Sequence, residues 1–374
     1  MTTAVYLDYN ASAPVRPEAK AALADALAMA GNASSMHRFG RLARRRLEDA
    51  REAVAALVGA RAERVVFTSG GTESNNLALC GARRARALVS AGEHDSVLNA
   101  APEAARVPLS RDGRVDLTAL AERLDEDPRP ALVSVMLANN ETGVIQPIAE
   151  VVETARARGA LVHCDAVQAA GKIPVDMAAL GVDLMSLSAH KLGGPQGVGA
   201  LVVAEGIELA AQLRGGGQER RARPGTENLP GIAGFGAAAA AAGAGLESMA
   251  ALAGLRDGME RRLRALAPEL EVYGAAAPRL PNTSCFAAPG LTAETQVMAL
   301  DLAGIAIGAG SACSSGKVTP SHVLAAMGAG AAEAGAAIRV SLGWDSAPED
   351  MERFLEAWGA LYSRGAAPAA SPAA

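Results

Sequence analysis

The sequence predicts an α/β fold, with a large domain built on a mainly parallel sheet and a smaller domain of the α+β type. From about residue 40 to residue 250, short apolar runs alternate with longer amphipathic segments, which is typical of a parallel sheet with helices on both faces. After residue 250 the alternation stops, and short strand-like runs follow a charged helix. Polar residues gather where apolar runs end, and parallel sheets bind ligands at these strand ends.

The elements of the first region follow from apolar periodicity and from the glycines and polar residues that bound each run. Helices are expected at 40–58, 74–86, 148–158 and 228–242. Strands are expected at 64–68, 87–90, 131–137, 161–165, 183–188 and 198–203. The Ala/Gly-rich stretch 231–245 is too short to span a bilayer, so we expect it to be a tightly packed helix.

The second region has a different order of elements. A charged helix at 255–266 precedes strand-like runs at 271–273, 283–287, 305–307 and 337–342, and a helix at 348–361 ends the pattern. We therefore predict a large domain at 15–250, and a small domain made of 1–14 and 251–364. The tail 365–374 is of low complexity and is expected to be disordered.

Composition narrows the function classes. Half of the 374 residues are hydrophobic, which suffices for a sizeable core, whereas only 3% are aromatic. A net charge of −5 and a pI near 5.7 argue against nucleic-acid binding. The four cysteines are scattered without a CxxC pair, and the first residues lack the pattern of a signal peptide. We therefore expect a cytoplasmic protein that neither spans a membrane nor binds nucleic acid directly.

Lys191 is the most informative residue of the sequence. It follows the apolar run 182–187 and Ser188, and a glycine-rich turn comes next. A buried lysine at a strand end can form a Schiff base with a carbonyl cofactor, because burial lowers its pKa. Asp165 ends another strand-like run, where pyridoxal phosphate needs a carboxylate beside its ring nitrogen. The order of these residues favours this reading over an exposed loop lysine.

A phosphate site is predicted where a strand meets a helix. Gly71 and Thr72 stand at this junction, where glycines let backbone amides approach an anion at the helix N-terminus. His94 follows the next strand-like run, where its imidazole could stack on a cofactor ring or make a local hydrogen bond at a helix start. His163 is expected to face away from the ring, and His37 and His322 carry no comparable signal.

Cys313 is the second informative residue. Glycines and serines surround it, so we expect an exposed, mobile loop on which a thiolate is accessible. No Cys or His stands at ligand spacing, so an intrinsic metal site is not expected. Cys80 and Cys164, in contrast, are expected to be buried and structural.

Arg339 lies in an apolar strand-like run of the small domain. Such an arginine needs a carboxylate partner. The partner could be an amino-acid substrate or an acidic side chain in a structural ion pair.

Together these segments resemble the class V pyridoxal-phosphate enzymes, which have the aspartate aminotransferase fold. More narrowly, the chain resembles the cysteine desulfurases of the nitrogen-fixation and iron–sulfur-assembly type (NifS/IscS). The matching segments are 6–14, 70–76, 139–143, 165–168, 188–191, 215–221, 225–228, 310–316 and 339–343. The match runs from about residue 5 to residue 360 and implies a seven-stranded sheet in the large domain.

The resemblance implies a role for each matching position. Lys191 would hold the cofactor, Asp165 would pair with its ring nitrogen and Gln168 with its phenolic oxygen. The phosphate would be held by Gly71, Thr72, Ser188, His190 and, across an obligate homodimer, Thr226. The substrate would be bound by Asn10, Asn140 and Arg339, with Asn140 also near the cofactor. His94 would stack on the ring and move protons, and Cys313 would be the nucleophile.

The implied reaction converts L-cysteine to L-alanine and leaves a persulfide on Cys313 for a sulfur acceptor or scaffold protein. Cys313 could contact an iron–sulfur cluster during transfer. Many relatives carry alanine at position 71, and threonine is common at position 314, where this chain has glycine and serine. The C-terminal segment does not match the ending of some family members, so the sequence does not identify the sulfur acceptor. Three alternatives stay open: a selenocysteine lyase, another aminotransferase-fold enzyme, and a catalytically silent sulfur-transfer scaffold.

Overall fold

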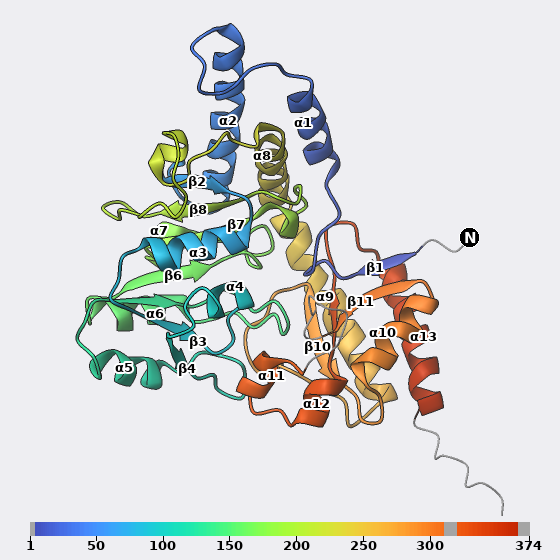
Figure 1. The fold of residues 1–374 in the computed structure, drawn as a ribbon. Helices are drawn as coiled ribbons and strands as arrows, with labels where there is room; N and C mark the ends of the chain where they lie inside the picture. The colour runs from blue at the N-terminus through green and yellow to red at the C-terminus, as the bar shows by residue number, and fades with distance from the viewer. Residues whose placement is uncertain (1–3, 310–319, 366–374) are drawn as a thin grey trace, which may run out of the picture.

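A computed structural model describes residues 4–309 and 320–365 of the chain. Its larger sheet has seven strands and confirms the predicted α/β class (Figure 1). In sheet order the strands are β2 (Val65–Thr68), β8 (Gly199–Val203), β7 (Leu184–Ser188), β6 (Leu161–Asp165), β5 (Ala131–Ser134), β3 (Arg86–Ser90) and β4 (Ala105–Val107). The pairs from β7 through β4 are parallel, whereas β8 runs antiparallel to both its neighbours.

Helices cover both faces of this sheet. They are α1 (Pro17–Leu27), α2 (Arg38–Leu57), α3 (Gly71–Gly81), α4 (Asp95–Leu98), α5 (Leu117–Asp125), α6 (Ile148–Arg156), α7 (Met177–Leu180) and α8 (Leu229–Ala244). Short 3₁₀ turns are η1 (Ala62–Arg64), η2 (Ala189–Lys191) and η3 (Gln218–Arg221). Because side chains alternate along a strand, Val65 and Phe67 join the core with α2 and α8, whereas Val66 packs with α3.

The second sheet has the order β1 (Val5–Leu7), β11 (Ile305–Ala309), β12 (Ile338–Ser341), β10 (Thr283–Ala287) and β9 (Glu271–Val272). Its helices are α9 (Leu246–Leu266), α10 (Ala293–Leu302), α11 (His322–Ala326), α12 (Ala331–Ala336) and α13 (Pro348–Gly365). Strand β1 pairs in parallel with β11, so the N-terminal chain lies beside residues about 300 positions later (Figure 1). The predicted domain boundaries stay predictions, and the tail 366–374 lies outside the described residues.

Element boundaries differ from the predictions where local geometry intervenes. The helix expected at 74–86 begins at Gly71 and ends at Gly81, because Arg83 adopts a positive φ of 51° and β3 begins at Arg86. The strand expected at 131–137 ends at Ser134. Helix α9 starts at Leu246, nine residues before the expected position 255. The sequence did not predict helices α1, α5 and α10 or the short helices α4, α7, α11 and α12.

The Ala/Gly-rich segment forms α8, which packs against α2. A Cβ on Gly236 would lie 2.6 Å from the Ala50 Cα, so only glycine permits this approach. Among the described residues no single helix has the length and apolar content needed to cross a membrane. Helices α8 and α9 meet those criteria only when they are taken together, and they bend by 65° at their junction.

Candidate active site

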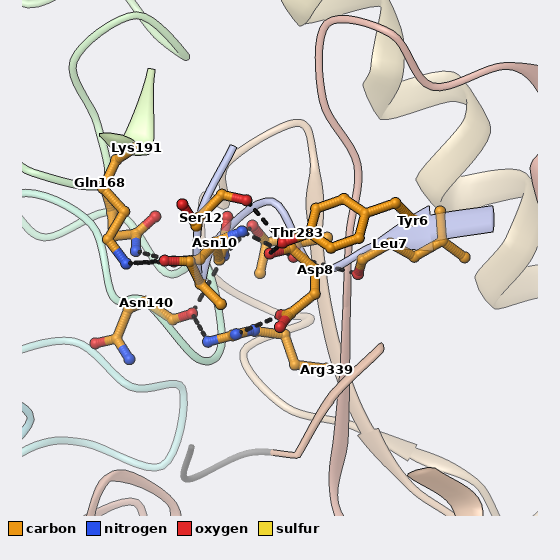
Figure 2. Close-up of polar contacts among 12 residues, drawn as sticks. Tyr6, Leu7, Asp8, Asn10, Ser12, Asn140, Gln168, Lys191, Thr283 and Arg339 are labelled. Carbon is orange, nitrogen blue, oxygen red and sulfur yellow. Dashed lines mark hydrogen bonds and ion pairs between the residues drawn. The ribbon is translucent and has the colours of Figure 1, made fainter. Parts of the chain in front are cut away.

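A cavity of about 520 Å³ lies at the carboxyl ends of β6 and β7, between the two sheets. Its wall contains most of the residues that the sequence predicts for the site. These are Asn10, Gly71, Thr72, His94, Asn140, Asp165, Gln168, Ser188, His190, Lys191 and Arg339. Figure 2 shows that Lys191, Gln168 and Asn140 approach Asn10 from the large sheet, while Arg339 approaches from the small one.

Asp165 ends β6 and is held as a fixed carboxylate at the cavity wall. Its Oδ1 accepts a hydrogen bond from the backbone N–H of Val167 at 2.9 Å. Its Oδ2 accepts one from Asn75 Nδ2 at 2.7 Å. Asn75 is buried on α3, and its Oδ1 has no hydrogen-bond partner among the described residues. The carboxylate is therefore aimed by two donors before any ligand arrives.

Lys191 lies on η2 and points toward the N-terminal segment rather than into solvent. Its Nζ donates to the backbone oxygens of Asn10 at 2.6 Å and Ala11 at 2.9 Å. Burial, followed by the Arg339 cation, lowers the pKa of Lys191 to about 8, against the opposing effect of Asp8 and Asp165. A substantial fraction of the amine is consequently neutral, and nucleophilic, near neutral pH.

The start of α3, where the sequence predicts a phosphate site, lies at the cavity wall. Gly71 is its first residue, and a Cβ there would lie 2.9 Å from the Val167 Cγ2 and 3.6 Å from the Ser188 Cβ. Glycine therefore lets the helix N-terminus approach the loops after β6 and β7. Across the cavity, burial and then the Lys191 charge lower the pKa of His190 to about 4, so its imidazole is neutral at neutral pH.

His94 makes the local hydrogen bond at a helix start, and its stacking on a cofactor ring stays a prediction. Its Nδ1 accepts a hydrogen bond from the backbone N–H of Ser96 at 3.1 Å, which caps α4, and lies 2.8 Å from the Ser96 hydroxyl. The ring also lines the cavity. Because Nδ1 is the acceptor, the neutral imidazole carries its proton on Nε2.

Arg339 is held by hydrogen bonds at both Nη atoms, whereas its Nε has none among the described residues. Its Nη2 donates to Asp8 Oδ1 at 2.7 Å and its Nη1 to the backbone oxygen of Asn140 at 2.9 Å. Its Nε is buried and has no partner among the described residues. Gly308 faces Arg339 across the sheet, where a Cβ would lie 2.8 Å from Asp8 Oδ1 and 2.9 Å from Arg339 Nη2.

Two predicted residues lie elsewhere. Thr226 is exposed and lines a smaller hollow with Ser69 and Arg223 instead of the main cavity. Cys313 lies outside the described residues. The expectation that Cys80 is buried is wrong: it stands near the end of α3, where that helix meets solvent. Cys164 is buried as expected, and burial raises the pKa of its thiol well above the usual value.

Several cavity residues were missed from sequence. Asn75 could have been found from helical spacing, because it stands one turn after Gly71. Glu141 and His322 also line the wall, and Ser321 donates to Glu141 at 2.5 Å. Glu141 stands in the segment 139–143, which the sequence already singles out, whereas no local pattern marks His322. His163 is buried between Ser134 and Ser186 and does not line the cavity.

Comparison with known proteins shows the family of the chain. The model of the aminotransferase class-V family matches residues 5–354. A cysteine desulfurase from Cereibacter sphaeroides is 44% identical over 368 residues, covering 94% of both chains. The chain belongs to the class-V aminotransferases, in their cysteine desulfurase branch.

Other desulfurase-branch proteins support the same assignment. An IscS-like cysteine desulfurase from Mycobacterium tuberculosis is 42% identical over 370 residues, covering 94% of both chains. The structure of a NifS-like protein from Rickettsia africae superposes with a TM-score of 0.88 at 34% identity. It covers 96% of this chain and 99% of its own, so the whole two-sheet architecture is shared.

Proposed function

We propose that this chain is a pyridoxal-phosphate enzyme that removes sulfur from L-cysteine and releases L-alanine. The observation that carries the proposal is that Lys191, Asp165 and Arg339 line one cavity. An enzyme of this kind needs a lysine for the cofactor aldehyde, an acid for the ring nitrogen and a cation for the substrate carboxylate. The names of the relatives favour L-cysteine as the amino acid.

The cavity residues fit the cofactor chemically. Asp165 presents a fixed carboxylate, Lys191 an amine of lowered pKa, and Gly71 an open helix N-terminus for a phosphate. The Asn75 Oδ1 and Arg339 Nε atoms are buried without partners, as expected of a cavity that receives polar ligands. Bound there, pyridoxal phosphate supplies an electron sink for the substrate α-carbon.

The protein's own groups then have distinct tasks. Arg339, with Asn140 beside it, orients the substrate carboxylate. Lys191 Nζ, with a pKa of about 8, can accept and return a proton at the substrate α-carbon near neutral pH. Thr72, Ser188 and His190 would hold the phosphate of the cofactor, Gln168 would donate to its phenolic oxygen and His94 would stack on its ring.

Sulfur transfer to Cys313 balances without an external reductant. The Cys313 thiolate attacks the substrate sulfur, an S–S bond forms, and the substrate C–S bond breaks. The transferred sulfur is oxidised to a persulfide while the substrate carbon is reduced and takes up a proton, which gives alanine. A sulfur-acceptor or scaffold protein then receives the persulfide sulfur.

The test follows products and sulfur separately. Purified protein should absorb visible light, and borohydride should fix the cofactor to Lys191. L-Cysteine should yield alanine, whereas an aminotransferase would release a keto acid. Cys313→Ser should keep the bound cofactor but lose sulfide release, and mass spectrometry should place the extra sulfur on Cys313. Sulfur found on Cys80, Cys164 or Cys285, or a colourless protein that binds no cofactor, contradicts the proposal.

We further propose a cytoplasmic homodimer with shared sites. Thr226 is supported as a contact to the partner's phosphate by its exposure and its distance in sequence from the other phosphate residues. Mixing Lys191→Ala with a Thr226→Trp variant should restore activity, because one site of the heterodimer collects both lesions and the other neither. Demonstrated subunit exchange without recovery contradicts shared sites. Cell fractionation tests the location.

A further inference from the structure

Lys172 is a buried lysine that no step of the proposed reaction uses. Only 4% of it is exposed, and it lies four residues after Gln168 in the loop that follows β6. Its Nζ donates to Gln168 Oε1 at 2.6 Å and to Asn10 Oδ1 at 2.7 Å. Both acceptors are side-chain amide oxygens of residues that line the cavity.

These two bonds decide which way the amides point. A protonated lysine offers only donors to its neighbours, so the amide atom that faces its Nζ is oxygen. The Gln168 Nε2 is thereby turned away from Lys172 and donates to the backbone oxygen of Asn10 at 2.9 Å. The same Asn10 oxygen accepts the bond from Lys191 Nζ, as Figure 2 shows for Gln168 and Lys191.

Lys172 fixes the orientation of Asn10 together with Asn282, whose Nδ2 also donates to Asn10 Oδ1 at 3.2 Å. With Oδ1 facing Lys172, its Nδ2 donates to the backbone oxygen of Asn140 at 3.1 Å and to the Thr283 hydroxyl at 2.9 Å. Asn10 therefore connects the large sheet, the N-terminal segment and β10 of the small sheet. Rotating either amide would place an N–H against the Lys172 amine and leave two donors facing each other.

The two observed bonds are compatible with either protonation state of Lys172. Burial, followed by the charges of Lys191 and Arg339, lowers the pKa of Lys172 well below its usual value. A neutral amine still has two N–H groups, which match its two amide acceptors.

We propose that Lys172 is a positioning residue, which orients the amides of Gln168 and Asn10 so that Gln168 presents an N–H donor to the phenolic oxygen of pyridoxal phosphate. The inference rests on the proposed function, because it assumes that the cavity holds this cofactor. Lys172 acts through Gln168, so its loss should resemble the loss of the Gln168 amide.

The experiment measures cofactor binding to the apoprotein and the position of its visible absorption band. Lys172→Met removes the donors while keeping the length of the side chain. The dissociation constant for pyridoxal phosphate should rise by about tenfold, as expected for a lost hydrogen bond to a charged acceptor, and the band should shift. Lys172→Gln, which keeps two N–H donors, should recover part of the affinity and the wild-type band.

A double-mutant cycle separates positioning from general destabilisation. In a Gln168→Ala background, adding Lys172→Met should change the dissociation constant by less than about twofold, because the amide that it orients is absent. The matched control is Gln146→Met, which removes a buried side chain that bonds Gly113 and Val115 away from the cavity. It should lower the melting temperature of the apoprotein without moving the band.

Three results overturn the inference while wild-type protein still binds the cofactor. They are an unchanged band and affinity in Lys172→Met, an equal loss of affinity with and without Gln168, and an equal band shift in Gln146→Met. If Lys172→Met yields no folded apoprotein, the same cycle with Lys172→Gln decides. Failure of the wild-type protein to bind pyridoxal phosphate refutes the proposed function instead.

Discussion

The lowered pKa of Lys191 can be tested directly on the apoprotein. With a pKa of about 8, about a quarter of the amine is neutral at pH ~7.5, against about 0.1% for an ordinary lysine. The difference in reactive amine is therefore about two-hundredfold. Removing the nearby Arg339 cation in Arg339→Gln should raise the pKa of Lys191, because that charge disfavours the ammonium form.

Reductive methylation with formaldehyde and borohydride, followed by peptide mass spectrometry, reports the labelling rate of each lysine against pH. The exposed Lys20 on α1 is a reference within the same molecule. The labelling midpoint of Lys191 should lie near pH 8 in the wild type and move upward in Arg339→Gln. The matched control, Arg46→Gln, removes a partly exposed cation on α2 and should leave the midpoint unchanged.

The reasoning is refuted if Lys191 and Lys20 share one labelling midpoint. It is also refuted if Arg339→Gln leaves the Lys191 midpoint unchanged, since burial alone would then account for the shift. A downward move would show that the sign of the Arg339 contribution is wrong.

Three further predictions concern stability and substrate binding. The pKa of Lys191 is lower in the folded than in the unfolded chain. The contribution of Lys191 to the free energy of unfolding therefore rises with pH between about 8 and 10.5, and it is lost as pH falls through this window. Lys191→Met should flatten that slope in denaturant titrations of the apoprotein. Gly308→Ala places a Cβ 2.9 Å from Arg339 Nη2, so it should lower the free energy of unfolding by about 1–3 kcal/mol. It should also raise KM for cysteine more than it lowers kcat. An unchanged KM would show that the arginine tolerates displacement. Trp358→Ala removes a fully buried ring that packs edge-on against Phe286 in the small domain, so it should lower the free energy of unfolding by about 3–5 kcal/mol by calorimetry, while an effect below about 1 kcal/mol would contradict the packing argument.

The fold and the chemical groups of the site are largely readable from sequence. Strand β6 has the predicted bounds, Leu161–Asp165, because a short apolar run that ends in a polar residue is a local signal. Asp165, Lys191 and Gly71 were placed at strand ends and a helix start for the same reason, and the parallel sheet brings those ends to one edge. Cys80 was misplaced, because the sequence does not show which side of α3 faces solvent near its end.

Only the tertiary structure decided how these groups are partnered. Asn10 reaches Lys191 across 181 positions of sequence and Thr283 across 273, and Asp8 meets Arg339 across 331. Such contacts have no periodicity to reveal them, because they arise where the N-terminal segment passes between two sheets that fold around separate cores. The sequence by itself determined which reactive groups the protein carries. Their protonation and orientation follow from burial and from hydrogen-bond partners that only chain packing brings into reach.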